Sequence, residues 1–351
     1  MPAPFIWKPA NPIPSFPPFT YNAISDMCFS ADASYLAVSC GTSVQFWDLI
    51  NDYPQYLGLS SKASGVASCI TSFKRIPAFV SGHSDGSLCV IQESVRTKLL
   101  EGFRCKAVLS MALFDDRLLA IITSDANVRI YEVGVLVPAR LVGAIPLRPT
   151  PLKCITMDLM PRAIHWLSPQ QLAVSYSDAI VIWDVEVGGR QPARLSMTEN
   201  IPITGSVADV TADGLALIRL PKNFKLLRLS AKHEPETIIR RSRDMAGLGP
   251  GTTAKFIGDM IFEASVGKAY LWKLDGRRLQ TFILPDKSSN WIHAFAYGKD
   301  AKNGRARIAL SLGHDASDGI AIWATYMPRN VTKLILLFYL VIFIILLVWK
   351  I

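Results

Sequence analysis

Residues 29–49 read FSADASYLAVSCGTSVQFWDL and contain the unit on which the fold prediction rests. A polar turn at Ser30-Ala31-Asp32 precedes one apolar run, and a second turn around Gly41 precedes another run that ends in Trp47-Asp48. Short runs of strand-forming residues bounded by turn residues are typical of β-hairpins. The stretch therefore predicts two antiparallel strands.

The same unit recurs along the chain. Clear copies are FDDRLLAIITSDANVRIYEV (114–133) and LSPQQLAVSYSDAIVIWDV (167–185), and weaker copies occupy 79–91, 211–229, 256–274 and 306–324. The aligned positions at the end of the second strand are Trp47, Val90, Tyr131, Trp183, Leu227, Trp272 and Trp323, separated by 41 to 52 residues. Seven units of this period built from short strands predict an all-β, seven-bladed propeller over residues 21–324.

The N-terminal residues 1–20 differ from the repeats. Residues 1–19, MPAPFIWKPANPIPSFPPF, hold seven prolines and no apolar signal-peptide core. Proline fixes φ and removes a backbone donor, so an extended arm is expected. We expect residues Pro14 to Tyr21 to supply the outer strand that closes the seventh blade, since closure removes exposed sheet edges.

The C-terminal end carries a continuous apolar run. Residues 334–349, LILLFYLVIFIILLVW, contain no charge and lie between Lys333 and Lys350. As a helix the run spans about 24 Å, which flanking lysines can extend toward the hydrocarbon thickness of a bilayer. We predict a transmembrane tail anchor after a linker at 325–333, with Leu334, Phe338, Tyr339, Phe343, Leu347 and Trp349 as anchor residues in the bilayer.

The position of this run predicts the topology of the protein. A span at the end of a chain without a signal peptide leaves the body on one side, and Arg329 and Lys333 before the span favour a cytosolic propeller. A short span fits the thinner ER membrane best, with other organelle outer membranes as alternatives. The competing interpretation is a buried core helix, which would leave the propeller soluble.

The repeats resemble those of the WD-repeat family. The resemblance rests on the Trp47-Asp48 and Trp183-Asp184 dipeptides, on the Ser-Ala-Asp and Ser-Pro-Gln turns, and on the Asp85-Gly86 hairpin. It covers roughly residues 20–326 and implies a propeller. The Gly-His dipeptide that usually opens a WD repeat is missing from its expected places, and only two of the seven dipeptides are Trp-Asp.

One motif suggests an enzyme. Gly82-His83-Ser84-Asp85-Gly86 fits G-x-S-x-G, the nucleophile elbow of serine hydrolases. The elbow needs a strand before the serine and a helix after it, whereas residues 87–91 form a strand-like apolar run. A related Gly-His and Asp-Gly pattern recurs at 311–319. Ser84 is therefore predicted to be a turn residue, and no catalytic residues are assigned.

Cofactor and metal sites are not expected either. The glycine-rich stretch 247–253 lacks the phosphate-loop spacing, and Pro250 removes a backbone donor. The five histidines have no metal-ligand spacing, and the six cysteines form no C-x-x-C pair. Buried free thiols in a reducing compartment are the prediction.

A basic stretch is the remaining candidate for binding. Between residues 219 and 243 there are eight lysines and arginines against two glutamates, in a chain of net charge +9. The candidate patch for anionic partners comprises Arg219, Lys222, Lys225, Arg228, Arg240, Arg241 and Arg243. It would suit anionic lipid or an acidic protein, while a solvated edge is the alternative. Nucleic acid is not expected, because aromatic residues are not interleaved.

These patterns favour a non-enzymatic scaffold that docks unidentified protein partners at a cytosolic membrane surface. The alternative comes from a second resemblance, to the ER-anchored WD-repeat exchange factors that act on the GTPase of the COPII coat. Their activity depends on an extended, cation-binding loop in the first blade. The corresponding segment here is the short Ser39-Cys40-Gly41-Thr42-Ser43.

Overall fold

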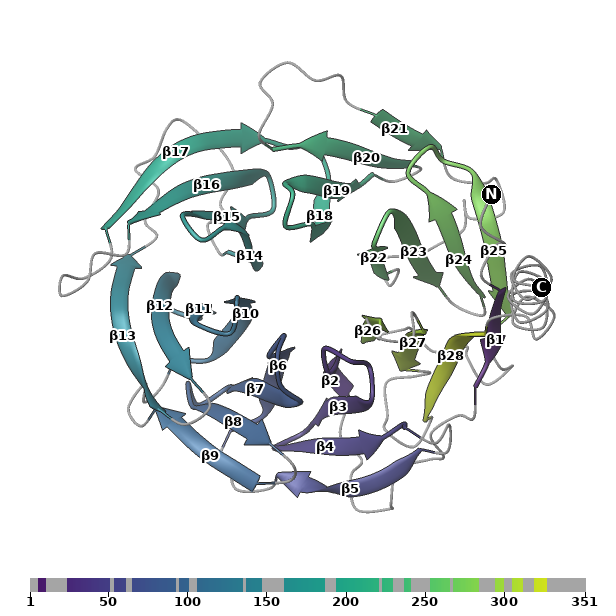
Figure 1. The fold of residues 1–351 in the computed structure, drawn as a ribbon. Helices are drawn as coiled ribbons and strands as arrows, with labels where there is room; N and C mark the ends of the chain where they lie inside the picture. Colours follow the sequence, from purple (N-terminus) through teal and green to yellow (C-terminus); the bar gives the residue numbers. More distant parts are fainter. Residues whose placement is uncertain are drawn as a thin grey trace, which may run out of the picture.

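The computed structural model describes residues 6–10, 24–50, 54–60, 65–92, 95–100, 106–134, 137–146, 161–186, 194–220, 223–229, 237–240, 253–265, 268–283, 294–299, 305–311 and 319–326. These residues form seven four-stranded antiparallel sheets arranged as blades around a central axis (Figure 1). The prediction of an all-β, seven-bladed propeller is confirmed.

The first four blades follow the chain without interruption. Blade 1 contains β2 (Ile24–Phe29), β3 (Tyr35–Cys40), β4 (Ser43–Asp48) and β5 (Gln55–Ser60). Blade 2 contains β6 (Ala67–Ser72), β7 (Ala78–His83), β8 (Leu88–Gln92) and β9 (Val95–Leu100). Blade 3 contains β10 (Val108–Phe114), β11 (Leu118–Thr123), β12 (Asn127–Gly134) and β13 (Val137–Pro146). Blade 4 contains β14 (Ala163–Ser168), β15 (Gln171–Ser175), β16 (Ala179–Glu186) and β17 (Arg194–Pro202).

The last three blades complete the ring. Blade 5 contains β18 (Ser206–Val210), β19 (Leu215–Arg219), β20 (Asn223–Arg228) and β21 (Thr237–Arg240). Blade 6 contains β22 (Thr253–Ile257), β23 (Met260–Ser265), β24 (Lys268–Lys273) and β25 (Arg278–Ile283). Blade 7 contains β26 (Phe295–Lys299), β27 (Ala306–Ser311), β28 (Ile320–Tyr326) and, as its outer strand, β1 (Ile6–Pro9).

The alternating strand directions define two faces of the disc. In each blade the first strand lies nearest the axis and the fourth lies at the rim (Figure 1). Face 1 is the face with the turns between the first and second strands and between the third and fourth strands. Face 2 is the opposite face, with the turns between the second and third strands. Because β28 is a third strand, it ends on face 1.

The N-terminal arm closes the ring through a strand earlier than the one predicted. Ile6 pairs with Tyr326 and Pro9 pairs with Trp323, so β1 occupies the outer position of blade 7. The expectation that Pro14 to Tyr21 would form this strand is wrong. The buried side chain of Trp7 provides the reason, because it gives β1 an apolar anchor against the ring of Phe282, 6.5 Å away. Strand pairing also extends through Tyr326, two residues beyond the expected end of the propeller.

The hydrophobic core lies between the blades. Seven apolar clusters of described residues fill the seven interfaces between neighbouring blades, including the one between blade 7 and blade 1. Burial of each large side chain contributes about 1.5–3 kcal/mol. Among the residues that the structure describes, every apolar cluster is shared by two blades, so each sheet packs on both neighbours. The buried Arg307 of blade 7 adds a polar link, because its guanidinium donates to the carbonyl oxygens of Ala33 and Leu49 in blade 1.

The repeated aromatic positions have one structural role. The side chains of Trp47, Tyr131, Trp183, Leu227, Trp272 and Trp323 all pack against the preceding blade. In blade 2 this position belongs to Ile91, which pairs with Phe79 and packs toward blade 1. Val90 packs toward blade 3. The sequence alignment was therefore wrong by one residue in blade 2, since successive side chains of a strand point to opposite sides.

Candidate functional site

The G-x-S-x-G motif forms a hairpin turn on face 2. Strand β7 ends at His83 and β8 begins at Leu88, so no helix follows Ser84. The Ser84 hydroxyl oxygen accepts a hydrogen bond from the backbone N–H of Val66 (2.8 Å), and Gly86 adopts a φ of 81°. Gly65 allows this close approach, because a Cβ there would lie 2.5 Å from the backbone nitrogen of Asp85. Ser84 is a turn residue, as predicted.

The histidine of the motif pairs with a different serine. His83 Nε2 lies 2.9 Å from the hydroxyl of Ser81, and its Nδ1 lies 3.2 Å from the carbonyl oxygen of Gly65. Both side chains are buried, with exposed fractions of 0% for Ser81 and 2% for His83. A catalytic pair needs access to substrate and an acceptor that orients the histidine toward a reacting group. This pair is buried in blade 2 and links the hairpin to Gly65, which precedes β6.

The two acidic residues of the turn in blade 3 also connect blades. The Asp116 carboxylate accepts hydrogen bonds from the backbone N–H groups of Lys74 and Arg75, and Asp115 forms a 3.0 Å ion pair with the Arg75 guanidinium. Both aspartates have positive φ values. The pair therefore ties a face 1 turn of blade 3 to the equivalent turn of blade 2.

The described residues of the predicted basic patch lie at different places in blade 5, and the patch as a whole stays a prediction. Arg219 ends β19 at face 2, and Arg240 ends β21 at the same face. Arg228 lies at the other end of β20, about 13 Å further along the strand. Phe224 and Leu226 pack toward blade 6, so Lys225 projects from the opposite side of the sheet. Lys222, Arg241 and Arg243 lie outside the described residues.

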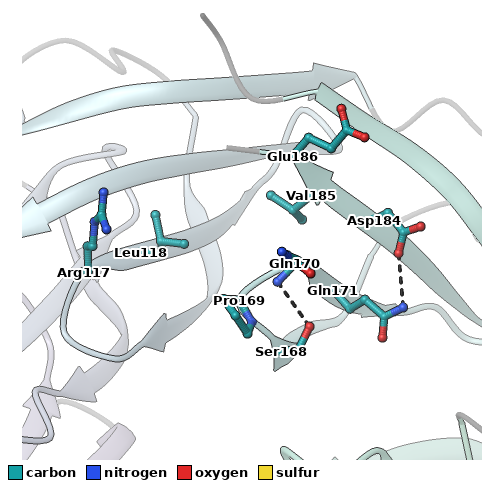
Figure 2. A pocket seen from close by; sticks show the side chains of 9 residues that line it. All are labelled: Arg117, Leu118, Ser168, Pro169, Gln170, Gln171, Asp184, Val185 and Glu186. Atoms are coloured by element: carbon teal, nitrogen blue, oxygen red, sulfur yellow. Dashed lines mark hydrogen bonds between the residues drawn. The ribbon is translucent and has the colours of Figure 1, made fainter. Parts of the chain in front are cut away.

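A pocket of about 880 Å³ opens on face 1 between blades 3 and 4 (Figure 2). Its lining consists of Arg117, Leu118, Ser168, Pro169, Gln170, Gln171, Asp184, Val185 and Glu186. Blade 3 supplies the residues on one side through the β10–β11 turn, and blade 4 supplies the rest through the β14–β15 turn and the end of β16. The pocket therefore exists only because two blades meet.

The polar side chains of the pocket are held in place by local hydrogen bonds. Gln171 Nε2 donates to the Asp184 carboxylate (3.1 Å), and the backbone N–H of Gln170 donates to the Ser168 hydroxyl (3.2 Å). Arg117 forms an ion pair with Glu132 of the same blade, with 2.8 Å between Nε and the carboxylate. Asp184 and Glu186 then line the other side of the pocket (Figure 2). Two carboxylates beside one paired arginine favour a ligand that carries a positive charge.

The aspartates of the two Trp-Asp dipeptides have different roles in blades 1 and 4. In blade 1, the Asp48 carboxylate accepts a hydrogen bond from the backbone N–H of Ile50 (2.7 Å) and shapes the end of its strand. In blade 4, Asp184 lines the pocket. Sequence reasoning assigned both aspartates and the Ser168-Pro169-Gln170 turn to the repeat and missed the pocket. Glu186 carries no motif, and these residues line one pocket with Arg117 only through the packing of two blades.

The first-blade hairpin is short. Gly41, with a φ of 56°, and Thr42 form the whole turn between β3 and β4, and the Ser43 hydroxyl donates to the carbonyl oxygen of Cys40 (2.9 Å). A loop that binds a cation needs several oxygen ligands from an extended segment. Two turn residues do not provide them.

Several other candidates fall partly or wholly outside the described residues. These are the tail at 334–349, the glycine-rich residues 247–252, His233, His293 and His314. Of the described histidines, His165 lies near Asp209 and Lys255 on the innermost strands, and its burial lowers its pKa. Within the described part of the chain, no three His, Cys, Asp or Glu side chains are grouped to hold a metal ion. That part also contains no helix with the length and apolar character needed to span a bilayer.

No protein-family model matches the sequence, and no curated protein matches it either. The blade architecture agrees with the resemblance to WD-repeat proteins at the level of fold. What the structure shows is a seven-bladed β-propeller, a fold used in general as a scaffold for protein interactions.

Proposed function

We propose that the protein is a non-enzymatic docking platform that is held at the cytosolic surface of an organelle membrane, the ER membrane first, by a C-terminal tail anchor. The observation that carries the proposal is the combination of a closed propeller with an uncharged sixteen-residue run directly behind its last strand. A rigid disc presents turns and pockets to partners, and a tail of this kind would restrict the disc to a membrane surface.

The pocket between blades 3 and 4 is the docking site that we favour on this platform. It is open at face 1 and lined by Asp184 and Glu186, which suits a lysine or arginine side chain of a partner protein. Neighbouring turns extend the contact surface beyond the pocket itself. The partner class that follows is a protein with an exposed basic segment.

Alkaline carbonate extraction tests the anchor. Membranes that contain the full chain are compared with membranes that contain a chain ending at Met327, and protease is added to intact membranes in parallel. We expect only the full chain to remain in the pellet, and we expect its propeller to be digested from the cytosolic side. Recovery of both chains in the supernatant would contradict the proposal and would favour a buried or partner-bound helix.

The alternative function is guanine-nucleotide exchange on a small GTPase of the ER coat machinery. The two-residue turn between β3 and β4 argues against it, because the related exchange factors use an extended loop at this place. A nucleotide-exchange assay with the purified chain separates the two functions. Strong acceleration of nucleotide release would replace the docking proposal.

A further inference from the structure

The last strand of the propeller determines which face lies nearest the tail. Strand β28 ends at Tyr326 on face 1, and the apolar run begins at Leu334. Seven residues lie between them, so even a fully extended connection reaches only about 25–30 Å. A membrane that holds the tail would therefore lie close to the face 1 side of blade 7.

Four basic residues lie on elements near this exit point. Lys273, Arg277 and Arg278 belong to the turn that joins β24 to β25 on face 1, and Lys8 lies on β1. We name these four residues the exit cluster. Lys8, Arg277 and Arg278 are exposed and Lys273 is partly exposed. Asp275 is the only carboxylate in the turn, and it accepts a hydrogen bond from the backbone N–H of Arg277 (2.9 Å).

Direct contacts tie this turn to the end of β28. Gln280 on β25 donates from Nε2 to the carbonyl oxygen of Trp7 (3.0 Å), and its Oε1 lies 3.4 Å from the Trp7 backbone nitrogen. Trp7 pairs in turn with Thr325, the neighbour of Tyr326. Strands β25 and β1 lie side by side at the rim (Figure 1). These contacts hold β25, and with it the turn between β24 and β25, beside the strands at which the chain leaves the propeller.

Charge is distributed unevenly over face 1. The exit cluster carries four cations on blades 6 and 7, whereas the pocket between blades 3 and 4 presents Asp184 and Glu186. Blades 3 and 4 lie across the ring from blades 6 and 7 (Figure 1). Anionic lipids attract basic groups near the membrane and repel carboxylates. An anionic surface beneath the exit point would tilt the disc so that the pocket turns away from the bilayer.

We propose that the exit cluster binds the anionic headgroups of the bilayer that holds the tail, so that blades 6 and 7 rest on the membrane and the acidic pocket faces the cytosol. This inference rests on the proposed function, since it requires the anchor. It assigns lipid binding to residues other than the basic stretch 219–243, and it leaves the pocket accessible to a protein partner.

Lysine acetylation of the full chain in vesicles tests the inference. Strand β24 provides a matched pair, because Lys273 ends it on face 1 and Lys268 begins it on face 2. The chain is inserted into vesicles of neutral lipid or of neutral lipid with about 30% phosphatidylserine. Acetylation is then measured residue by residue by mass spectrometry, with the exposed Lys106 on face 2 as a second reference.

We expect Lys8 and Lys273 to react about fivefold more slowly on the anionic vesicles, while Lys268 and Lys106 react equally on both. Raising the salt concentration to about 1 M should remove most of the difference, because it shortens the screening length to about 3 Å. Unchanged rates at Lys8 and Lys273, or equal slowing at all four lysines, would overturn the inference.

Charge reversal separates lipid binding from simple proximity. The double variant Arg277→Glu/Arg278→Glu should lose the slowing at Lys273, whereas the face 2 variant Lys106→Glu should keep it. Persistence of the slowing in the double variant would also overturn the inference. Carbonate extraction of the same vesicles distinguishes the two failures. A chain that is extracted contradicts the anchor, whereas a chain that stays but shows no pattern contradicts only the role of the exit cluster.

Discussion

Asp125 shows how a single carboxylate organises a turn of this propeller. It lies in the turn between β11 and β12, where its carboxylate accepts hydrogen bonds from the Thr123 hydroxyl and from the Arg129 guanidinium (3.0 Å). Burial opposes ionisation, but these hydrogen bonds outweigh burial and hold the pKa of Asp125 well below its usual range. The ionised form is therefore stabilised by folding.

We predict that Asp125→Asn lowers the free energy of unfolding by about 1–3 kcal/mol at pH 7, because hydrogen bonds to a charged group are lost. A depressed folded-state pKa contributes stability above the unfolded pKa near 4, and this contribution disappears as the pH falls through the folded pKa. The difference from the wild type in urea unfolding should therefore shrink below about pH 4. A difference that stays constant from pH 7 to pH 3 would contradict the assignment.

Strand β1 is the element that turns an open arc of blades into a ring. Four residues at the start of the chain pair with the last strand, and without them β28 would expose an unpaired edge. The side chain of Trp7 holds the strand in place, since it is 5% exposed and packs between the apolar residues of blades 6 and 7. The neighbouring Lys8 is exposed.

Truncation of Trp7 should therefore weaken ring closure. We expect Trp7→Ala to lower the free energy of unfolding by about 3–5 kcal/mol, measured by urea unfolding followed by circular dichroism. The matched variant Lys8→Ala, on the same strand, should change it by no more than about 0.5 kcal/mol. Equal midpoints for both variants would show that β1 does not contribute to closure.

At the scale of the whole molecule, every blade depends on its neighbours. Cys69 in blade 2 lies in the apolar cluster shared with blade 3, and burial raises the pKa of its thiol to about 12, with a further contribution from Asp26. A thiol reacts as the thiolate, so the native protein should protect Cys69. Reaction of the Cys69 thiol in blade 2 therefore reports whether a change in blade 7 opens the ring elsewhere.

We predict that iodoacetamide labels Cys69 at least ~100-fold more slowly in the native protein than in urea. Because neighbouring blades share apolar clusters around the whole ring, Trp7→Ala should raise the labelling of Cys69 although the two residues lie in different blades. Mass spectrometry of the labelled peptide gives the rate. Labelling of Cys69 at the wild-type rate in a destabilised Trp7→Ala protein would mean that the blades open independently.

Local patterns in the sequence were sufficient for the repeat architecture. Strand-forming runs, turn residues and a recurring aromatic position indicate seven units, because each of these properties acts over a few neighbouring residues. The same local reasoning identified Ser84 as a turn residue, since the run after it has the character of a strand. The apolar run at 334–349 is equally visible in the sequence, and its place in a membrane remains a prediction.

Contacts between residues far apart in the sequence determined the features that local patterns did not predict. The register of blade 2 differs by one residue because packing against two neighbours, and not the local pattern, selects Ile91. Residues Ile6–Pro9 close the ring because the Trp7 side chain is buried against blade 6. Arg219 and Arg228 are close in sequence but lie at opposite ends of a blade, whereas strands β1 and β25 are brought together by ring closure. The pocket exists only between two blades, and the exit cluster combines the β24–β25 turn of blade 6 with Lys8 of the N-terminal strand, so only the tertiary structure could reveal them.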